Sequence, residues 1–336
     1  MYEQMSTPYE SVARPSGGTG SSPGGVQATG LGRRFDDLWA LRGLELDVAP
    51  GTTLGLLGHN GAGKTTAIRI LTTLTAPSEG SATVAGFDVV KSGHSVRERI
   101  GVAAQQATVD GLMSARLNLQ MIGRLHGLPK AQAKVRADEL LERLDLSDAA
   151  SRLVKTFSGG MRRRLDLAAS IVARPEVLFL DEPTTGLDPR SRNDLWEILR
   201  DLVADGMTLI LTTQYLEEAD RLADDIVVLD HGRTVAHGTP SALKARIGND
   251  RIDVTVASKP ELHAAGAALE RFSGEEAHLE PDRLVASVPV ADGVRLIDVM
   301  RALEIDGIDA VDLNRRQATL DDVFLTLTSK PQEVPA

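Results

Sequence analysis

The sequence predicts an α/β protein built around a parallel sheet, followed by a small α+β module. From about residue 50 to residue 230, apolar runs as long as buried strands alternate with helical patterns, which is typical of parallel α/β sheets. A glycine-rich turn at residues 58–66 joins the first of these strands to a helix, and this is the context that a phosphate-binding loop requires. After residue 240 the pattern changes to short strands and helices without a recognisable chemical motif.

Composition and charge limit the classes of function. The chain has 336 residues, enough for two domains, and its 42% hydrophobic and 25% charged residues are ordinary for a globular protein. The formal net charge of −10 argues against a protein that follows nucleic-acid phosphates, because such a protein needs a basic face. The absence of cysteine excludes disulfides, thiolate zinc sites and cysteine nucleophiles. No apolar stretch is long enough to span a membrane, so we expect another chain to supply any spanning helices.

The composition also divides the chain into segments. Residues 1–25 carry a Gly/Ser-rich run and predict a disordered tail. Residues 26–240 hold the alternating strands and helices, with a helical insertion over about 106–157. Residues 241–330 are expected to form the accessory α+β module, and residues 331–336 a short tail.

A β-rich stretch from residue 26 to residue 48 precedes the phosphate loop and contains two aromatic residues, Phe35 and Trp39. Either ring could be part of the core, and either could instead offer a flat surface on which adenine stacks. Spacing alone leaves both readings open. Further strands are expected at 82–85 and 100–103, and Gln105 follows the second of them.

The phosphate loop follows a buried strand at 53–57 and precedes a helix at 67–71. Its glycines allow a tight turn that aims successive N–H groups at an anion, and the helix N-terminus adds positive potential. Lys64 is expected to reach the β- and γ-phosphates, and the Thr65 hydroxyl to bind Mg²⁺. The loop residues expected to contact nucleotide are Gly58, Asn60, Gly61, Ala62, Gly63, Lys64, Thr65 and Thr66.

Residues 113–150 are predicted to be helical. Leu117, Met121 and Leu125 recur at the spacing of one helix face, and Pro129 suits the start of a second helix. Leu140, Leu141 and Leu144 form another apolar face.

Two later segments add residues with possible chemistry. Ser158, Gly159 and Gly160 precede a helix at 162–173 and form a second anion-receptive terminus, although the same residues suit an ordinary capped helix start. The apolar run 177–180 ends in Asp181 and Glu182, and ligands of parallel sheets bind at that end of the strands. Asp181 is placed to hold Mg²⁺ through water, and Glu182 to polarise an attacking water. In isolation the same acidic pair could be a solvated turn.

The remaining elements complete the pattern. A strand at 207–213 ends at Gln214, and a hairpin is expected around His231-Gly232. In the accessory module, strands are expected at 253–256, 284–288 and 308–313, helices at 260–272 and 292–304, and a capped last helix from Thr319.

Taken in order, these motifs resemble those of the ATP-binding subunit of an ABC transporter, over roughly residues 27–240. GHNGAGKTT is similar to the Walker A loop, FSGGM to the signature motif, VLFLDEP to the Walker B strand with its catalytic Glu, and Gly186-Leu187-Asp188 to the D-loop. The resemblance implies a P-loop NTPase fold with an antiparallel β subdomain and a helical subdomain. It also implies that Gln105 links Mg²⁺ to the helical subdomain, that Phe35 stacks on adenine, and that Asp188 borders the nucleotide.

Two positions depart from the common pattern, and they narrow the match. Gln214 stands where the switch segment usually has His, and Met161 where the signature usually has Gln. A glutamine amide can donate a hydrogen bond to a γ-phosphate oxygen but cannot carry a proton or a charge. With GGMRRRLDLA and residues 320–325, these departures resemble the daunorubicin/doxorubicin-resistance type of exporter ATPase.

The resemblance implies an ATPase that uses ATP and Mg²⁺ to power efflux of a drug or antibiotic-like compound through a separate membrane permease. Two such chains are expected to dimerise head to tail at the cytoplasmic face of the membrane, with each ATP between the loop of one chain and the signature of the other. Nucleic acid is not an expected partner. Two alternatives remain: a soluble ABC-type ATPase, against which the charge and the lack of a second ATPase domain argue, and a nucleotide-gated regulator, which Gln214 keeps open and Glu182 argues against.

Overall fold

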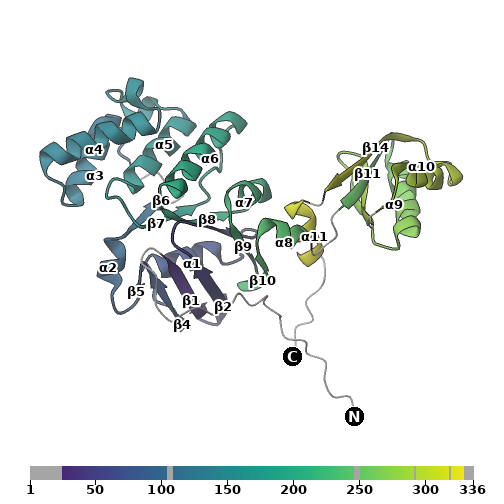
Figure 1. Cartoon of the computed structure of the whole chain (residues 1–336), viewed down its shortest axis with the longest axis horizontal. Coiled ribbons are helices and arrows are strands. Elements are labelled where there is room, and N and C mark those ends of the chain that lie inside the picture. The colour runs from purple at the N-terminus through teal and green to yellow at the C-terminus, as the bar shows by residue number, and fades with distance from the viewer. Residues whose placement is uncertain (1–24, 104–108, 246–249, 291–292, 318, 329–336) are drawn as a thin grey trace, which may run out of the picture. The chain divides into compact units, whose positions relative to one another are not determined.

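The computed structural model describes residues 25–103, 109–245, 250–290, 293–317 and 319–328. Gln105, the tail expected over 1–25 apart from its last residue, and the tail at 331–336 lie outside the described residues. The chain divides into two compact units, Met1–His237 and Gly238–Ala336. We describe each unit separately (Figure 1).

A six-stranded sheet forms the centre of the first unit, with strand order β10-β9-β3-β8-β7-β6. β3 pairs in parallel with β8 and β9, and β7 pairs in parallel with β8 and β6. The strands are β3 (Thr53–Leu57), β6 (Ile100–Ala103), β7 (Val177–Asp181), β8 (Thr208–Thr213), β9 (Asp225–Asp230) and β10 (Arg233–Gly238). The carboxyl ends of β3, β7 and β8 lead directly into the phosphate loop, Glu182 and Gln214. The sheet therefore places three of the predicted site segments at one edge.

A second, antiparallel sheet with strand order β2-β1-β4-β5 also belongs to the first unit. Its strands are β1 (Val26–Phe35), β2 (Leu38–Val48), β4 (Glu79–Val84) and β5 (Phe87–Asp88). The β-rich stretch before the phosphate loop is thus a long hairpin, β1 and β2. Helix α1 (Lys64–Leu71) follows the phosphate loop, and the short α2 (Gly93–Arg97) precedes β6.

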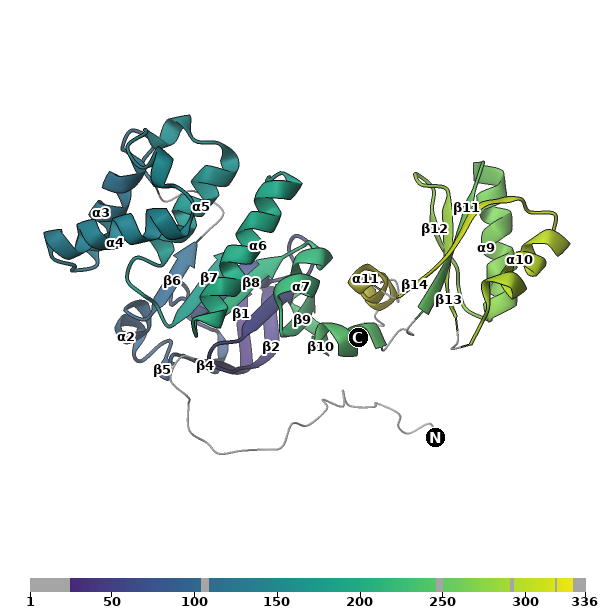
Figure 2. The ribbon, with the colours of Figure 1, turned by 45° about the horizontal axis from the view of Figure 1, so that its top comes forward.

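The remaining helices of this unit lie on the other side of the six-stranded sheet from β1, β2 and β4 (Figure 2). They are α3 (Ala115–Leu125), α4 (Lys130–Arg143), α5 (Gly159–Ser170), α6 (Pro189–Ala204) and α7 (Leu216–Leu222), with 3₁₀ turns at Ser147–Ala149 and Val154–Thr156. Alternate residues of the central strands explain the two layers. Leu178 and Leu180 of β7 pack with the helices, whereas Val177 and Phe179 pack with α1 and the antiparallel sheet. Strands buried on both faces are expected to be continuously apolar, as β7 is.

The apolar face predicted on α3 does not pack on the core. Leu117, Met121 and Leu125 are 51%, 37% and 79% exposed, and the buried side of α3 is made of Ala115, Asn118, Leu119 and Gly123. The periodicity was that of a helix, but the small residues Ala115 and Gly123 let α3 approach its neighbours on the opposite side. In α4, by contrast, Leu140 and Leu141 are buried as the pattern indicated.

The second unit is a four-stranded antiparallel sheet, ordered β12-β13-β11-β14, with α9 and α10 on one face (Figure 2). Its chain order and strand order are those of a ferredoxin-like fold. The elements are α8 (Pro240–Ala245), β11 (Asp250–Val256), α9 (Lys259–Ser273), β12 (His278–Glu280), β13 (Val285–Val290), α10 (Leu296–Ile305), β14 (Ala310–Gln317) and α11 (Leu320–Thr328). α10 begins at Leu296, after its N-cap Arg295, and therefore later than the predicted residue 292.

Helix α11 begins as the capping signal indicated. The Thr319 backbone N–H donates to Asp322 Oδ2 at 2.8 Å, and the Asp322 N–H points back to Thr319 Oγ1 at 3.4 Å. The same carboxylate accepts from Arg316 Nη1 at 2.6 Å and lies 3.1 Å from Arg251 Nε. Asp322 thus joins the start of α11 to β11 and β14 through a buried ion-pair network.

Candidate active site

The phosphate loop has the backbone that its glycines predict. Gly61 and Gly63 have φ angles of 85° and 106°, in the region that favours glycine. A Cβ atom on Gly58 would lie 2.4 Å from the Leu229 carbonyl oxygen, and one on Gly63 would lie 2.6 Å from that of Ala40. Side chains at these positions would therefore push the loop away from β9 and β2. Ala62 is buried, whereas Asn60, Gly61 and Thr65 are exposed at the mouth of the loop.

Lys64 lies folded over this loop. Its Nζ atom donates to the carbonyl oxygens of Gly58 at 2.6 Å and His59 at 3.2 Å, and it is 3.5 Å from Glu182 Oε1. The side chain is buried, so the ammonium is surrounded by oxygen acceptors at the base of the loop. A cation held here is positioned to meet anionic oxygens that enter the loop.

Thr65 and Asp181 provide oxygen atoms suited to a hard cation. The Thr65 hydroxyl donates to Asp181 Oδ2 at 3.2 Å, and the Thr212 hydroxyl donates to Oδ1 at 2.5 Å. Hydroxyl and carboxylate oxygens are the ligands that Mg²⁺ prefers. These contacts bring together a residue of α1 and a residue at the end of β7, so the donor set fits Mg²⁺.

Glu182 stands directly after β7 in a strained conformation. Its φ angle is 48°, a left-handed value that costs a non-glycine residue on the order of 1–3 kcal/mol and persists only where the surrounding contacts outweigh that cost. Its N–H lies 3.1 Å from the Thr212 carbonyl and 3.0 Å from the Thr212 hydroxyl. Its carboxylate lies close to Lys64 and accepts from the Thr185 hydroxyl at 3.4 Å. The carboxylate is therefore held at the edge of the sheet where the phosphate loop begins.

Arg163 of α5 supports the same backbone from the other side. Its Nε donates to the Pro183 carbonyl at 2.6 Å, and its Nη2 lies 3.3 Å from both the Asp181 and Glu182 carbonyls. Burial lowers the pKa of this guanidinium, and the nearby charges of Asp166, Glu218 and Asp181 reverse only part of the effect. Sequence reasoning missed both Arg163 and Thr212, because their roles depend on which segments lie beside β7.

The signature segment and the D-loop meet each other. Ser158 is the N-cap of α5 and accepts from the Met161 N–H, and Asp188 is the N-cap of α6 and accepts from the Ser191 N–H at 3.2 Å. Hydrogen bonds from Ser191 hold the pKa of Asp188 below its usual range. A Cβ atom on Gly160 would lie 2.6 Å from Ser191 Oγ, so a larger residue here would displace the Ser191 side chain. Among the described residues, no hydrogen bond or ion pair joins Ser158, Gly159 or Gly160 to the phosphate loop.

The other predicted residues are less closely tied to the loop. Gln214 is half-buried just after β8, and no hydrogen bond of its amide is found within the described residues. Phe35 is 44% exposed at the end of β1, with the Arg33 guanidinium 4.8 Å from its ring centre. Trp39 lies in β2 next to Ala40, whose carbonyl borders Gly63. Both aromatic rings therefore remain candidates for base stacking.

Residues 41–185 match the family described as ABC transporter. The chain is 51% identical, over 92% of its length and 97% of the relative's, to the daunorubicin resistance ATP-binding protein DrrA3 of Streptomyces coeruleorubidus. It is 46% identical to the doxorubicin resistance ATP-binding protein DrrA of Mycobacterium tuberculosis, with 88% of this chain and 90% of that protein covered. The Nod factor export ATP-binding protein I of Ralstonia nicotianae is 40% identical, with coverage of 94% and 97%.

Solved structures agree on the fold. An ATP-binding subunit of an ABC transporter matches with a TM-score of 0.59 and 25% identity, over 66% of this chain and 92% of that one. The cbiO1 subunit of Clostridium perfringens matches with a TM-score of 0.62 and 24% identity, over 74% and 96%. Within the described residues of this chain, every helix is too short or too polar to cross a bilayer.

Proposed function

Because the chain belongs to the ABC transporter family of ATP-binding proteins, we propose that it powers efflux of a drug or antibiotic-like compound through a separate membrane permease. Membership of this family identifies the chain as an ATPase. The drug-resistance names of relatives that match nearly the whole chain support the class of cargo. The observation that carries the proposal is the meeting of the phosphate loop, Asp181 and Glu182 at one edge of the sheet.

The proposed roles follow from where these side chains lie. The loop N–H groups and Lys64 bind the phosphates, while Thr65 and Asp181 would hold Mg²⁺. Mg²⁺ supplies neutralisation of charge on the phosphate oxygens when bound. Glu182 accepts a proton from the attacking water, and Gln214 donates to the γ-phosphate. Gln105 is proposed as a further Mg²⁺ contact from the family pattern alone.

Adenine is proposed to stack on Phe35, by analogy with the position of the family's aromatic residue. The 44% exposure of this side chain, which leaves part of the ring accessible, supports the role. Trp39 is the alternative platform.

We further propose that two copies form the working ATPase, head to tail. The signature residues Ser158, Gly159 and Gly160, with Asp188, make no bond to the loop of their own chain within the described part. A helix terminus with free N–H groups can bind an anion presented by another molecule. Each ATP would then lie between the loop of one chain and the signature of its partner.

The exposed stripe on α3 supports a membrane partner. Leu117, Met121 and Leu125 form one exposed face of this helix. Contiguous apolar side chains on a surface mark interaction sites more often than chance. We propose that a permease covers this stripe and holds the chain at the cytoplasmic face of the membrane.

The variant Glu182→Gln tests the assignment of the base. It should bind MgATP within a few-fold of the wild-type affinity, hydrolyse it at least about 100-fold more slowly, and accumulate as an ATP-bound dimer on gel filtration. Glu217→Gln is the matched control, because it makes the same chemical change on the exposed surface of α7. Turnover by Glu182→Gln equal to that of the control would contradict the role.

The cargo is tested with inverted membrane vesicles from cells that make the chain and its membrane partner. A fluorescent anthracycline should accumulate inside in an ATP-dependent manner, and Glu182→Gln should abolish the accumulation. Equal accumulation by the two proteins would refute coupling of this ATPase to drug export.

A further inference from the structure

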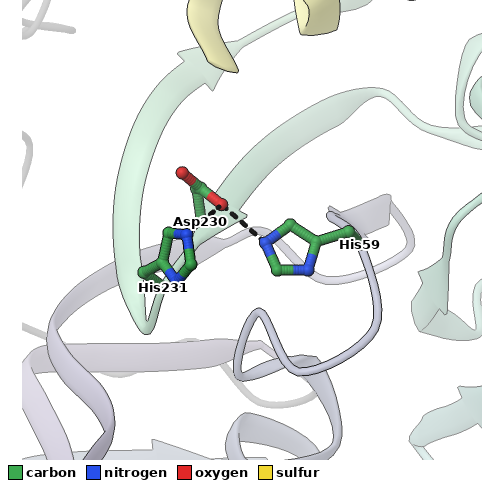
Figure 3. Close-up of side chains that lie close together, drawn as sticks. All are labelled: His59, Asp230 and His231. Carbon is green, nitrogen blue, oxygen red and sulfur yellow. Dashed lines mark hydrogen bonds and ion pairs between the residues drawn. The ribbon is translucent and has the colours of Figure 1, made fainter. Parts of the chain in front are cut away.

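Three side chains of metal-binding type gather beside the phosphate loop, away from Thr65 and Asp181. They are His59 of the loop and Asp230 and His231 at the tip of the β9–β10 hairpin (Figure 3). His59 Nε2 lies 2.7 Å from Asp230 Oδ1, and His231 Nε2 lies 3.9 Å from the same oxygen. One ligand atom from each residue can be chosen so that all three lie within 4.8 Å of one another. No role in ATP hydrolysis uses these three side chains.

The hydrogen bonds of His59 leave room for a cation. Its Nδ1 is 2.6 Å from the Asn60 carbonyl oxygen, and its Nε2 faces the Asp230 carboxylate. Both neighbours can only accept, whereas a neutral imidazole has a single N–H to donate. With the proton on Nδ1, the Nε2 lone pair points at a carboxylate oxygen, and this is favourable only if a proton or a metal ion lies between them. An Nδ1–H bonded to a backbone carbonyl is also the usual way in which a metal-binding histidine is oriented.

The hairpin tip is a rigid platform for the other two ligands. His231 and Gly232 form its two-residue turn with φ angles of 46° and 77°, as a type I′ turn requires. The Gly232 N–H donates to the Ala62 carbonyl at 3.1 Å, and the Gly232 carbonyl accepts from the Arg42 N–H at 2.7 Å. The tip is therefore fixed to the phosphate loop and to β2 by one backbone bond each, independently of the three side chains.

We propose that His59 Nε2, Asp230 and His231 Nε2 bind a divalent transition-metal ion of the Zn²⁺ class. Ligands about 2.0–2.1 Å from a tetrahedral ion lie about 3.3 Å apart. The observed separations of 2.7 Å and 3.9 Å from Asp230 Oδ1 lie on either side of that value, and the three ligand atoms lie within 4.8 Å of one another, so rotations of the three side chains complete the site. The His231 side chain is 84% exposed, which leaves the fourth position open to water. Two imidazoles and one carboxylate favour Zn²⁺, Co²⁺, Ni²⁺ or Cu²⁺ over Mg²⁺ and Ca²⁺.

A metal ion at this position would restrain the phosphate loop. The His59 carbonyl accepts from Lys64 Nζ and from the Ala62 N–H, so the backbone of His59 is part of the loop that surrounds the phosphates. Binding joins the first half of the loop to β9 and β10 through side chains as well as through backbone. We therefore expect the metal to stabilise the nucleotide-free protein.

Titration of the full-length, tag-free, nucleotide-free protein with Co²⁺ tests the site, because Co²⁺ bound by imidazole and carboxylate absorbs visible light. Wild type should bind one equivalent with the absorption of a four- or five-coordinate ion, and Zn²⁺ should displace it. His231→Asn should lose at least about tenfold in affinity. It suits the turn, because Asn-Gly is a favoured type I′ pair, so folding is expected to survive.

His94→Ala is the matched control, since His94 is an exposed histidine that pairs with Glu98 at 3.3 Å and belongs to no three-ligand cluster among the described residues. It should titrate as wild type does. In parallel, saturating Zn²⁺ should raise the melting temperature of wild type and His94→Ala by about 2 °C or more, and not that of His231→Asn. Absence of Co²⁺ absorption below millimolar metal, or an unchanged titration of His231→Asn, would overturn the proposal.

Discussion

Replacement of Arg163 by methionine should slow ATP hydrolysis without a comparable loss of ATP binding. The guanidinium makes one short charge-assisted bond, from Nε to the Pro183 carbonyl at 2.6 Å. Its Nη2 shares two longer contacts of 3.3 Å with the Asp181 and Glu182 carbonyls. Methionine keeps an apolar stem of similar length and suits a helix, so the change removes these bonds together with the positive charge that faces Asp166, Glu218 and Asp181.

The expected size of the effect follows from that geometry. A hydrogen bond to a charged donor contributes about 1.5–3 kcal/mol, and the two longer contacts add little because they share one nitrogen. The bond holds the turn in which Glu182 keeps its left-handed φ of 48°, while the Thr212 bonds to the Glu182 N–H remain. If the loss of this hydrogen-bond energy displaces the Glu182 carboxylate from the attacking water and raises the barrier to hydrolysis by the same amount, kcat falls by about 10- to 100-fold. Lys64, Thr65 and Asp181 side chains are not displaced, so KM should change by less than about threefold.

The assay compares steady-state ATPase kinetics of wild type, Arg163→Met and Arg162→Met. Arg162 is exposed on the preceding position of α5, so its variant loses the same charge and adds the same side chain. Arg163→Lys should recover part of kcat, because one ammonium can still reach one of the carbonyls. Equal kcat for Arg163→Met and Arg162→Met would refute the reasoning. A loss of kcat/KM that comes entirely from a higher KM would refute it as well.

Two further predictions concern Gln214 and Asp322. If the Gln214 amide donates to the γ-phosphate, Gln214→Ala should turn over about ten- to a hundredfold more slowly, and Gln214→His should retain activity and gain a pH dependence near neutrality. Turnover measured against pH decides this, and a Gln214→Ala enzyme as fast as wild type would make the residue a spectator. Burial raises the pKa of Asp322, but the hydrogen bonds from Arg316 and Thr319 outweigh it and lower this pKa from 3.8 to about 2. Because the folded-state pKa is depressed, this ionised carboxylate stabilises the fold above about pH 4, by about 1–2 kcal/mol after allowance for solvent screening, and the contribution disappears as the pH falls toward 2. Asp322→Asn should therefore lower the free energy of unfolding at pH 7 by about 3 kcal/mol, since Arg251 and Arg316 lose the carboxylate that they share. The difference in free energy of unfolding from wild type should narrow in urea titrations between pH 5 and pH 2.5. A gap independent of pH would contradict the ion-pair account.

The site residues that act close to one another in the chain could be predicted from the sequence. The glycines of the phosphate loop, with Lys64 and Thr65, act within a few residues of one another, and their backbone angles follow from residue type. Asp181 and Glu182 were predictable because a fully apolar run ended in two acids. The ABC ATPase fold, expected from the order of the motifs, is confirmed by the matching family and solved structures.

Residues that act across the chain could not be predicted in this way. Arg163 reaches the Glu182 turn only because α5 packs beside β7, and its neighbours in the sequence carry no sign of that contact. The exposed stripe on α3 is a second example. A period of 3.6 residues predicts a helix with an apolar face, but it does not predict whether that face packs on the core of the same chain. The elements β5 and α2 were missed because two and five residues are too few to show a period.

The position of β3 in the sheet has a consequence for how the protein is made. This strand, which leads into the phosphate loop, lies between β8 and β9 in the sheet, so Leu54 pairs with Ile210 and Asp225. These partner strands lie far from β3 in the sequence, so a long segment of chain must close into a loop before they pair. Strands that pair over long sequence separations form slowly. During synthesis on the ribosome, the phosphate loop cannot reach its final form until β8 has emerged. We expect nucleotide to protect nascent chains from proteolysis only once they extend beyond β9, and shorter chains to depend on chaperones while their apolar strands are exposed.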